Sequence, residues 1–228
     1  PSGRVEPGEA LAVGLGLSFL SVAMLAVFAN LLAAGLLAFT IFFYAVIYTM
    51  WLKRSTPQNI VIGGAAGAFP PMIGWAAVTG DLTLAPVLLF MVIFLWTPPH
   101  FWALALFRNA DYESVGVPMM PVVAGDAATR RQIFWYAALL VPVAILPAFT
   151  VAGGPIYLIV ATLASLRFAT DAWRVSRRTA DEAEADKFRG EKKLFGTSIV
   201  YLFAVFGALI ADALLRALTG PFGWPVWL

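Results

Sequence analysis

The sequence contains no cysteine among its 228 residues, which excludes disulfide bonds and thiolate metal sites. Charged residues are scarce: they make up 12% of the chain, against roughly 25% in soluble proteins. Hydrophobic residues make up 61%, more than a soluble domain of this size could bury, so the composition indicates a polytopic protein of the lipid bilayer. The net charge of +2 is too small and too unevenly placed to suggest nucleic-acid binding.

Common catalytic motifs are also missing. The sequence has no GxGxxG, P-loop, CxxC or HExxH pattern, and its only histidine is His100. The 8 Trp, 18 Phe and 6 Tyr are ample for membrane-interface belts and for lining a hydrophobic cavity. Any chemistry must therefore come from the few polar residues beside the apolar runs.

Apolar runs near the length that a helix needs to cross the hydrocarbon of a bilayer, about 20 residues, recur seven times along the chain. The predicted spans are Ala10–Phe28, Leu31–Leu52, Ile60–Val78, Leu84–Phe107, Ile133–Val151, Pro155–Ala169 and Thr197–Leu218. The third is rich in glycine and proline, and the sixth is short. The sequence thus predicts an all-α polytopic membrane protein, with residues 1–228 forming a single membrane domain.

The basic residues test this arrangement. All but one of the 15 lie before the first span, after the second or fourth, or around the end of the sixth and the link that follows it, and only Arg216 falls on the opposite face. Because Lys and Arg gather on the cytoplasmic side, the pattern predicts a cytoplasmic N-terminus and an external C-terminus. The link from Asp171 to Lys193 alternates in charge, so we expect a solvated helical connection with surface ion pairs.

The segment Trp96-Thr97-Pro98-Pro99-His100-Phe101-Trp102 is the first candidate site. Two prolines predict that the helix breaks or loosens here, and Pro70-Pro71 predicts a second break. An ionisable residue in a membrane span is by default a functional hypothesis, and imidazole can ligate iron or move a proton near neutral pH. The alternative is a buried histidine satisfied by one hydrogen bond. Close helix packing explains the Gly-x-x-x-Gly spacing that begins at Gly63.

A loop on the basic face is the second candidate site. Tyr48, Lys53, Arg54 and Asn59 would gather at the mouth of the second and third spans. Adjacent Lys and Arg suit a phosphate group, because the Lys ammonium is a compact positive charge and the Arg guanidinium can form two parallel hydrogen bonds with phosphate oxygens. The alternative is a basic anchor at the membrane surface.

The third candidate follows His100, where Arg108, Asp111 and Tyr112 mark a return to polar sequence. Asp111 could hold a magnesium ion that bridges to phosphate oxygens. A lone loop aspartate is as often a helix cap, so both interpretations stay open.

Together these stretches resemble the protohaem IX farnesyltransferase (haem O synthase) family, within the UbiA-like superfamily of membrane aromatic prenyltransferases. The likeness is dense to Ile133 and looser beyond it. The matching segments are Tyr48–Gly64, Pro70–Gly80, Trp96–Leu106 and Asp111–Val123. Arg108 stands near where quinone-forming relatives carry an aspartate, which fits the haem branch.

The resemblance implies a nine-helix bundle with a central cavity open to the cytoplasm, of which this chain would supply seven helices. It implies transfer of farnesyl from farnesyl diphosphate to a vinyl group of haem B, with Mg²⁺ as cofactor, in a bacterial inner membrane beside other membrane proteins of haem synthesis. The residues expected to be catalytic are Asp111, which is also the metal ligand, Lys53 and Arg54. The diphosphate would be bound by Tyr48, Lys53, Arg54, Asn59 and Arg108. The haem and substrate cavity would be lined by His100, Trp96, Phe101, Trp102 and Tyr112.

One departure concerns the family's first aspartate motif, NxxxDxxxD, which this chain lacks. In the family that motif precedes a loop resembling Pro1–Arg4, and the sequence starts without methionine. Seven spans with a cytoplasmic N-terminus are expected if the first two helices are missing. We therefore expect a fragment that is inactive alone.

Two other functions stay open. A related enzyme could prenylate a phenolic quinone precursor, although His100 and the lone Asp111 argue against it. A transporter could use a broken-helix site, although transporters often carry paired repeats and none is evident here.

Overall fold

The computed structural model describes residues 5–108, 118–220 and 223–227. Within these residues the chain forms helices and links and contains no strand. The elements are α1 (Pro7–Phe28), α2 (Leu31–Phe42) with its π-helical continuation η1 (Phe43–Leu52), α3 (Asn59–Ala68), α4 (Pro70–Thr79), α5 (Leu84–Phe107), α7 (Met120–Ala124), α8 (Asp126–Ile145) with the 3₁₀ turn η2 (Leu146–Phe149), α9 (Pro155–Ser176), α10 (Ala180–Ala185) and α11 (Arg189–Thr219).

Seven helical units in the described part are long and apolar enough to cross a membrane, which confirms the seven predicted spans. The main differences lie at the basic end, where α8 begins at Asp126, α9 continues to Ser176 and α11 begins at Arg189. Hydropathy locates only the part of a helix that lies in hydrocarbon, so it misses polar turns that extend beyond it. The chain is an integral membrane protein.

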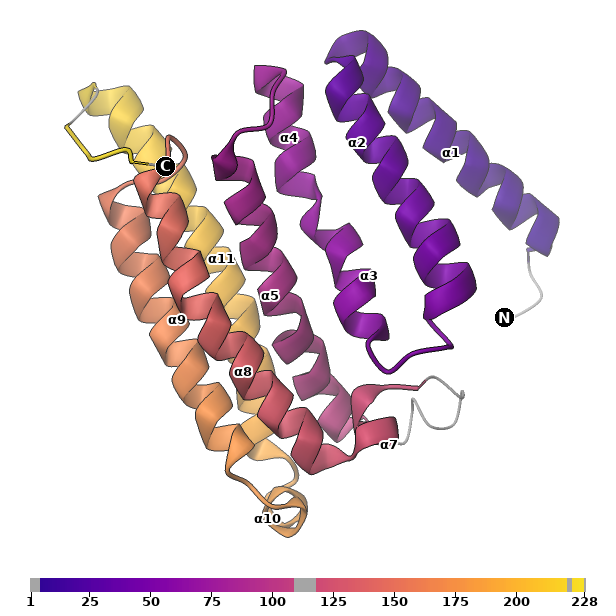
Figure 1. Cartoon of the computed structure of the whole chain (residues 1–228), viewed down its shortest axis with the longest axis vertical. Coiled ribbons are helices and arrows are strands. Elements are labelled where there is room, and N and C mark those ends of the chain that lie inside the picture. Colours follow the sequence, from indigo (N-terminus) through magenta and orange to yellow (C-terminus); the bar gives the residue numbers. More distant parts are fainter. Residues whose placement is uncertain (1–4, 109–117, 221–222, 228) are drawn as a thin grey trace.

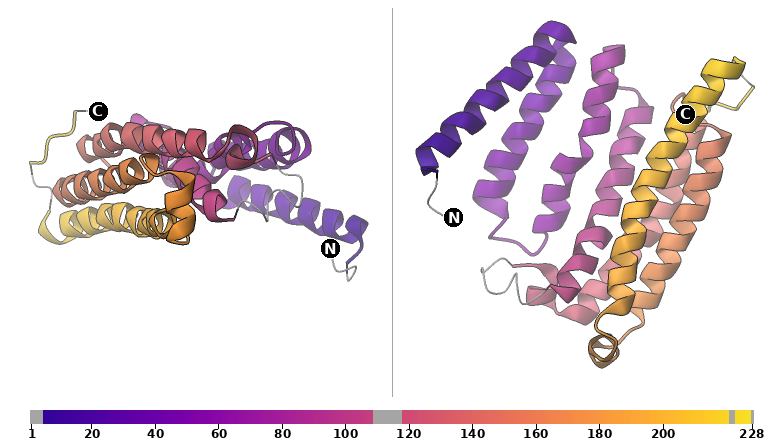
Figure 2. Two further views of the ribbon diagram at one scale, coloured as in Figure 1. Left: turned by 90° about the horizontal axis from the view of Figure 1, so that it is seen from below. Right: turned by 180° about the vertical axis from the view of Figure 1, so that it is seen from behind.

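The helices form a row that thickens at one side (Figures 1 and 2). Helices α5, α8, α9 and α11 pack around a common core that contains Trp102, Ile133, Tyr157 and Tyr201. The α3–α4 unit packs on α5, α2 packs on α4, and α1 packs on α2 at the far edge. No residue of α1 is buried, an arrangement compatible with a helix whose apolar side chains contact lipid.

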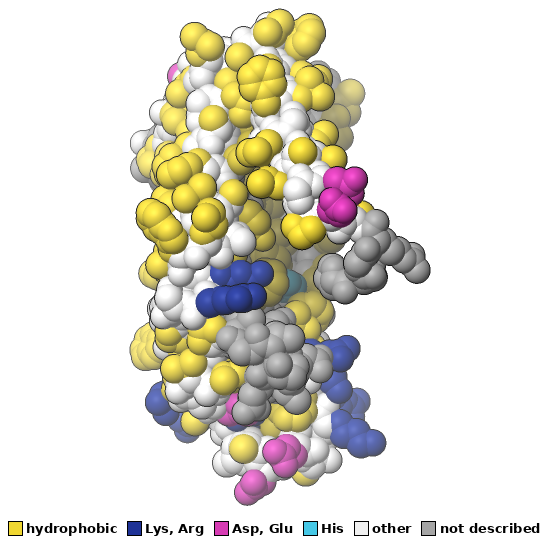
Figure 3. All heavy atoms as spheres, turned by 90° about the vertical axis from the view of Figure 1, so that its right-hand side faces the viewer, with side chains coloured by type: hydrophobic (Ala, Val, Ile, Leu, Met, Phe, Trp, Pro, Cys, Tyr) yellow, Lys and Arg dark blue, Asp and Glu magenta, His cyan; other side chains and the backbone are white. Residues whose placement is uncertain are grey.

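Basic side chains gather at one end of the molecule. In Figure 1 the link that follows η1, the C-terminal ends of α5 and α9, and the short helices α7 and α10 all lie at the lower end. In Figure 3 the visible Lys and Arg side chains lie in the lower half, whereas the upper half is mainly apolar. We call this lower end the basic end.

The two proline pairs behave differently. Phe69 interrupts the helix between α3 and α4, so the break predicted at Pro70-Pro71 is confirmed. The break predicted at Pro98-Pro99 is wrong, because α5 continues through both residues. Tertiary packing explains the difference: α5 is packed by α3, α4, α8 and α11, and both prolines are buried. The helix is loosened only in that Pro98 and Pro99 have no N–H to donate to the turn before them.

The second span changes its winding before it reaches the basic end. In η1 the hydrogen bonds run from residue i+5 to residue i, and the last one, from Lys53 N–H to the Tyr48 carbonyl, measures 2.8 Å. The Thr49 hydroxyl also donates to the Tyr44 carbonyl, at 2.7 Å. Extended π-winding is rare in proteins and occurs frequently at functional sites. The π-helix ends directly before Lys53 and Arg54.

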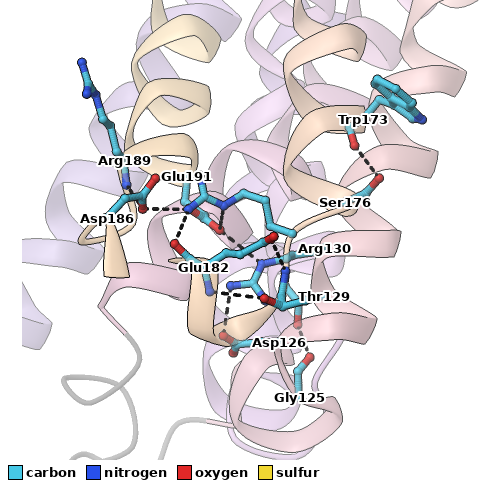
Figure 4. A network of polar contacts seen from close by, with 12 residues as sticks. Gly125, Asp126, Thr129, Arg130, Trp173, Ser176, Glu182, Asp186, Arg189 and Glu191 are labelled. Carbon is cyan, nitrogen blue, oxygen red and sulfur yellow. Dashed lines mark hydrogen bonds and ion pairs between the residues drawn. The ribbon is translucent and has the colours of Figure 1, made fainter. Parts of the chain in front are cut away.

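A buried ion network joins α8, α10 and α11 at the basic end (Figure 4). Arg130 Nε lies 3.2 Å from Glu191 Oε1, and both side chains are almost completely buried. Arg178 lies 3.7 Å from the same Glu191 oxygen and 2.7 Å from Asp186 Oδ1. The hydrogen bond from Arg178 lowers the pKa of Asp186 below its ordinary value.

The expectation of a solvated helical connection from Asp171 to Lys193 is confirmed for most of its charged side chains, which are exposed, and is wrong for two of them. Glu191 is fully buried, and Asp171 is only 3% exposed and pairs with Arg167, Arg174 and Lys193. Alternating charge looks the same in a sequence whether the helix faces water or another charged helix, so the pattern could not separate these cases.

Candidate functional site

Two cavities lie along one face of α5. The first, of about 440 Å³, is lined by η1, α3, α5 and α11, and the second, of about 660 Å³, is lined by α4, α5 and α11. We call them the η1 cavity and the α11 cavity. Ile93, Trp96 and Leu202 line both, so the two are neighbouring parts of one hollow. In Figure 3 the histidine side chain, in cyan, is visible deep between apolar side chains.

Aromatic rings and glycines form the wall of the η1 cavity. Tyr44 and Tyr48 line it with ring centroids 5.3 Å apart. A Cβ atom on Gly63 would meet the Tyr48 ring at 2.6 Å, and one on Gly64 would meet the Thr97 methyl group at 2.6 Å. These two glycines therefore permit close packing, as the sequence predicted.

Gly67 has a different role. A Cβ atom there would have no neighbour within 4 Å, although the residue lines the η1 cavity. The prediction that packing explains the whole glycine run is wrong at this position, because Gly67 borders open space.

The imidazole of His100 is held on three sides in the α11 cavity. Its ring stacks on Trp96, with centroids 4.3 Å apart, and on Phe195, with centroids 4.7 Å apart. Its Nδ1 lies 2.6 Å from Ser198 Oγ. The same serine accepts a hydrogen bond from Trp96 Nε1 at its carbonyl, at 2.8 Å. Because both faces and one edge of the ring are occupied, a ligand can reach it only through the remaining edge, which carries Nε2.

The turn between η1 and α3 brings three predicted residues together. Lys53 donates its backbone N–H to Tyr48, and Asn59 Nδ2 donates to the Lys53 carbonyl at 3.2 Å. Asn59 is buried at the start of α3, whereas the side chains of Lys53 and Arg54 are exposed. The turn therefore presents two cations beside the end of the η1 cavity that Tyr48 lines.

Other predicted site residues lie elsewhere. Phe101 lines the η1 cavity, but Trp102 is fully buried in the core, where its ring packs edge-on against Tyr136 of α8. Trp102 contributes to neither cavity wall, because adjacent helical residues point in directions about 100° apart. Arg108 caps the basic end of α5. Asp111 and Tyr112 lie outside the described residues.

The described residues do not assemble a metal site. They contain no group of three or more His, Asp or Glu side chains that could hold an ion. Asn59 Oδ1 is buried without a hydrogen-bond partner in the described part. It could serve as an oxygen ligand of a metal ion, but one oxygen is too few for Mg²⁺.

The sequence did not identify the contribution of α11. Phe195 and Leu202 line the cavities and Ser198 contacts the imidazole, yet all three lie about 100 positions from His100. A serine in an apolar span is a weak signal for an interhelical hydrogen bond, but it does not name its partner. Asp212 was missed as well: this buried carboxylate accepts the Ile156 and Tyr157 N–H groups at 3.1 and 2.7 Å and so caps α9.

The fold and the hollow define a class: an all-helical integral membrane protein with an apolar, aromatic hollow and a cationic turn beside it. The UbiA prenyltransferase family model matches residues 1–199, and the chain belongs to this family. This confirms the predicted superfamily. Members of the family generally use a divalent metal to bind diphosphate.

Close relatives carry one name. The chain is 61% identical to the Protoheme IX farnesyltransferase of Dinoroseobacter shibae, over 94% of this chain and 68% of that protein. It is 58% identical to the protein of that name from Ruegeria pomeroyi, over 100% of this chain and 70% of the relative. It is 56% identical to the protein of that name from Cereibacter sphaeroides (strain ATCC 17025), over 100% of this chain and 72% of the relative. No solved structure matches the chain.

Proposed function

We propose that this protein transfers the farnesyl group of farnesyl diphosphate to a vinyl group of haem B and so forms haem O. The observation that carries the proposal is a single imidazole clamped between aromatic rings in an apolar cavity of about 660 Å³. This volume falls within the range of about 300–1,000 Å³ usual for small-molecule sites. The shared name of the relatives supports the same reaction.

The two cavities suit two substrates. Haem B is a flat, largely apolar molecule with a metal at its centre, and the α11 cavity offers it apolar walls and His100. The η1 cavity offers the farnesyl chain aromatic surface from Tyr44, Tyr48 and Phe101. Trp96 borders both cavities, so in this assignment the allylic carbon and the haem vinyl group meet near its ring.

The basic end would hold the diphosphate. Lys53 and Arg54 supply cationic donors that form charge-assisted hydrogen bonds with phosphate oxygens, and Arg108 lies at the same end. Tyr48 and Asn59 fix the turn that carries Lys53. Cations at this place stabilise the charge that develops on the leaving group.

The proposed reaction consists of one bond broken in farnesyl diphosphate and two bonds formed at the vinyl group of haem B. The C–O bond to diphosphate breaks and its electron pair leaves with the diphosphate, which gives an allylic cation. Ring faces of Trp96 and Phe101 can stabilise that cation. The vinyl group of haem B supplies the electrons for the new C–C bond, and water adds to the resulting cation, loses a proton and leaves a hydroxyl group. The apolar walls exclude water from the first cation, which would otherwise yield farnesol.

The predicted Mg²⁺ and its ligand Asp111 complete the proposal. The ion would neutralise diphosphate charge, as family members generally do with a divalent metal. No step above depends on its geometry, because the described residues do not form its site.

Membrane placement is also part of the proposal. The gathering of Lys and Arg at one end favours a cytoplasmic orientation for that end. The bacterial relatives favour the inner membrane, where other membrane enzymes of haem synthesis would supply or consume the substrates.

Product analysis tests the reaction. Membranes carrying the protein expressed from its complete gene are incubated with haem B, farnesyl diphosphate and Mg²⁺, and the pigments are analysed by mass spectrometry. We expect a haem heavier by one farnesyl group plus one hydroxyl group. Prenylation of a phenolic acid instead would support the quinone-precursor alternative, and solute flux without any prenyl diphosphate would support a transporter.

Variants of the cationic turn test its role in the same assay. Loss of one charge-assisted hydrogen bond, worth about 1.5–3 kcal/mol, should raise KM for farnesyl diphosphate roughly 10–100-fold in Lys53→Ala or Arg54→Ala. Arg131→Ala removes an exposed cation from α8 at the basic end and is the matched control. An equal rise in KM in all three variants would show that Lys53 and Arg54 act only as general basic anchors at the membrane surface.

A further inference from the structure

The hydroxyl group of Ser198 has a single proton, and the acceptor to which it donates that proton determines which ring nitrogen of His100 is protonated. Ser198 lies on α11 and is fully buried. Its Oγ donates to the Phe195 carbonyl at 2.5 Å, one turn earlier in the same helix. A carbonyl oxygen can only accept, and two oxygens 2.5 Å apart repel each other unless a proton lies between them. We therefore assign the serine proton to that bond and the serine lone pairs to the imidazole.

His100 Nδ1 lies 2.6 Å from those lone pairs. Two acceptors cannot share a hydrogen bond, so Nδ1 must carry a proton and donate it to Ser198 Oγ. In a neutral imidazole only one nitrogen is protonated, and Nε2 is then bare.

The remaining contacts fix where the bare nitrogen lies. Stacking on Trp96 and Phe195 fixes the ring plane, and the bond from Trp96 Nε1 to the Ser198 carbonyl fixes α5 against α11. Nε2 has no hydrogen-bond partner among the described residues, and it is not one of the buried polar atoms without partners. It therefore lies on the accessible edge of the ring, in the wall of the α11 cavity.

We infer that Ser198 is a positioning residue that locks His100 in the Nδ1–H tautomer and presents the Nε2 lone pair to the α11 cavity. His100 then acts there as an electron-pair donor and not as a proton donor. With the proposed function, on which this part rests, the natural acceptor of that pair is the iron of haem B. Imidazole bound to a metal through one nitrogen commonly donates its other N–H to a neighbouring acceptor, which is the arrangement seen here.

The 228 residues contain one histidine, and a His100→Gln variant identifies its signal among any that the rest of the complete protein contributes. The protein is produced from its complete gene with a non-histidine tag and ¹⁵N-labelled histidine, in detergent or lipid, without any substrate. Nitrogen NMR at about pH 8, where an unperturbed imidazole with a pKa of about 6.5 is neutral, distinguishes the protonated from the bare ring nitrogen. We expect a protonated Nδ1 and a bare Nε2 in the wild type. A protonated Nε2 would overturn the inference.

Variants identify the residue responsible. In Ser198→Ala the Nδ1 proton loses its acceptor, so the signal should move towards the Nε2–H tautomer that free histidine prefers. Ser198→Thr keeps the hydroxyl and should restore the wild-type spectrum. Ser165→Ala is the matched control, because Ser165 is also buried and hydrogen-bonded, to Tyr201 instead of to an imidazole.

An Nδ1–H tautomer that persists unchanged in folded Ser198→Ala would remove Ser198 from the role. Should that variant fail to fold, the wild-type and Ser198→Thr spectra still decide the tautomer. Since no substrate is present, these results are independent of the product analysis. Haem O production together with an Nε2–H histidine would overturn only the tautomer inference. An Nδ1–H histidine without haem O production would overturn only the proposed function.

Discussion

Two glycines of α3, Gly64 and Gly67, should respond oppositely to the same substitution. Gly64→Ala places a Cβ 2.6 Å from the Thr97 methyl group and 3.0 Å from Thr97 Cβ on α5. Thr97 cannot rotate away cheaply, because its hydroxyl donates to the Ile93 carbonyl at 2.8 Å. Overpacking of this kind costs about 1–3 kcal/mol, and the better helix propensity of alanine returns about 0.5–1 kcal/mol. We expect a net loss of about 1–2 kcal/mol in the free energy of unfolding.

Gly67→Ala meets no atom within 4 Å, so only the propensity gain remains. We expect it to be as stable as the wild type or more stable, by up to about 0.5–1 kcal/mol. Both free energies can be measured by SDS titration in mixed micelles, followed by circular dichroism.

Thr97→Ser provides the internal control for this pair. It removes the methyl group that Gly64→Ala would strike and keeps the hydroxyl bonded to Ile93. The double variant should therefore recover part of the loss, because the contact with Thr97 Cβ at 3.0 Å remains. Equal destabilisation by both glycine variants, or no recovery in the double variant, would refute the assignment of Gly64 to packing and Gly67 to open space.

Three further outcomes follow from the structure. Gly67→Leu should fill part of the η1 cavity and raise KM for farnesyl diphosphate at unchanged stability, measured in the product assay; an unchanged KM would place the farnesyl chain elsewhere. Glu191→Ala should cost about 1.5–3 kcal/mol in SDS unfolding because it removes one of the two carboxylates that pair with the buried cation of Arg130, the other being Asp126 at 3.3 Å, and a cost below about 1 kcal/mol would contradict the pairing with Glu191. The pKa of Asp186 is lowered by its hydrogen bond from Arg178, so its stabilising contribution is complete above the ordinary carboxyl pKa of about 3.9 and is lost as the pH falls through the lowered value. Thermal unfolding should show this loss in the wild type below about pH 4 and a weaker one in Asp186→Asn.

Much of the fold could be predicted because membrane helices follow simple rules. Apolar length located all seven spans, and the basic residues identified one end, since both signals come from interactions with the bilayer rather than with other helices. Proline was less reliable. The same dipeptide breaks the helix at Pro70 and not at Pro98, because only the second lies where four helices pack around it.

The candidate site could be predicted only in part. His100 and Trp96 were found because polar and aromatic residues in an apolar run are conspicuous. The partners of His100 on α11 could not be found, because the contact depends on how two helices distant in sequence are placed. Trp102 shows the converse error: it shares a motif with His100 but points into the core.

Helix α11 is anchored at both ends, and this determines how the hollow can adapt to a ligand. Near one end Glu191 joins the buried ions, and near the other Asp212 and Arg216 hold the link between α8 and α9, Arg216 through the carbonyls of residues 151–153. These anchors are roughly 30 Å apart at 1.5 Å per residue, so the helix between them has little freedom to slide. The opposite wall consists of η1, α3 and α4, with a π-helix and a break at Phe69. The hollow thus has one anchored wall, which carries the imidazole partner, and one less regular wall, and we expect a bulky ligand to be accommodated by movement of the less regular side.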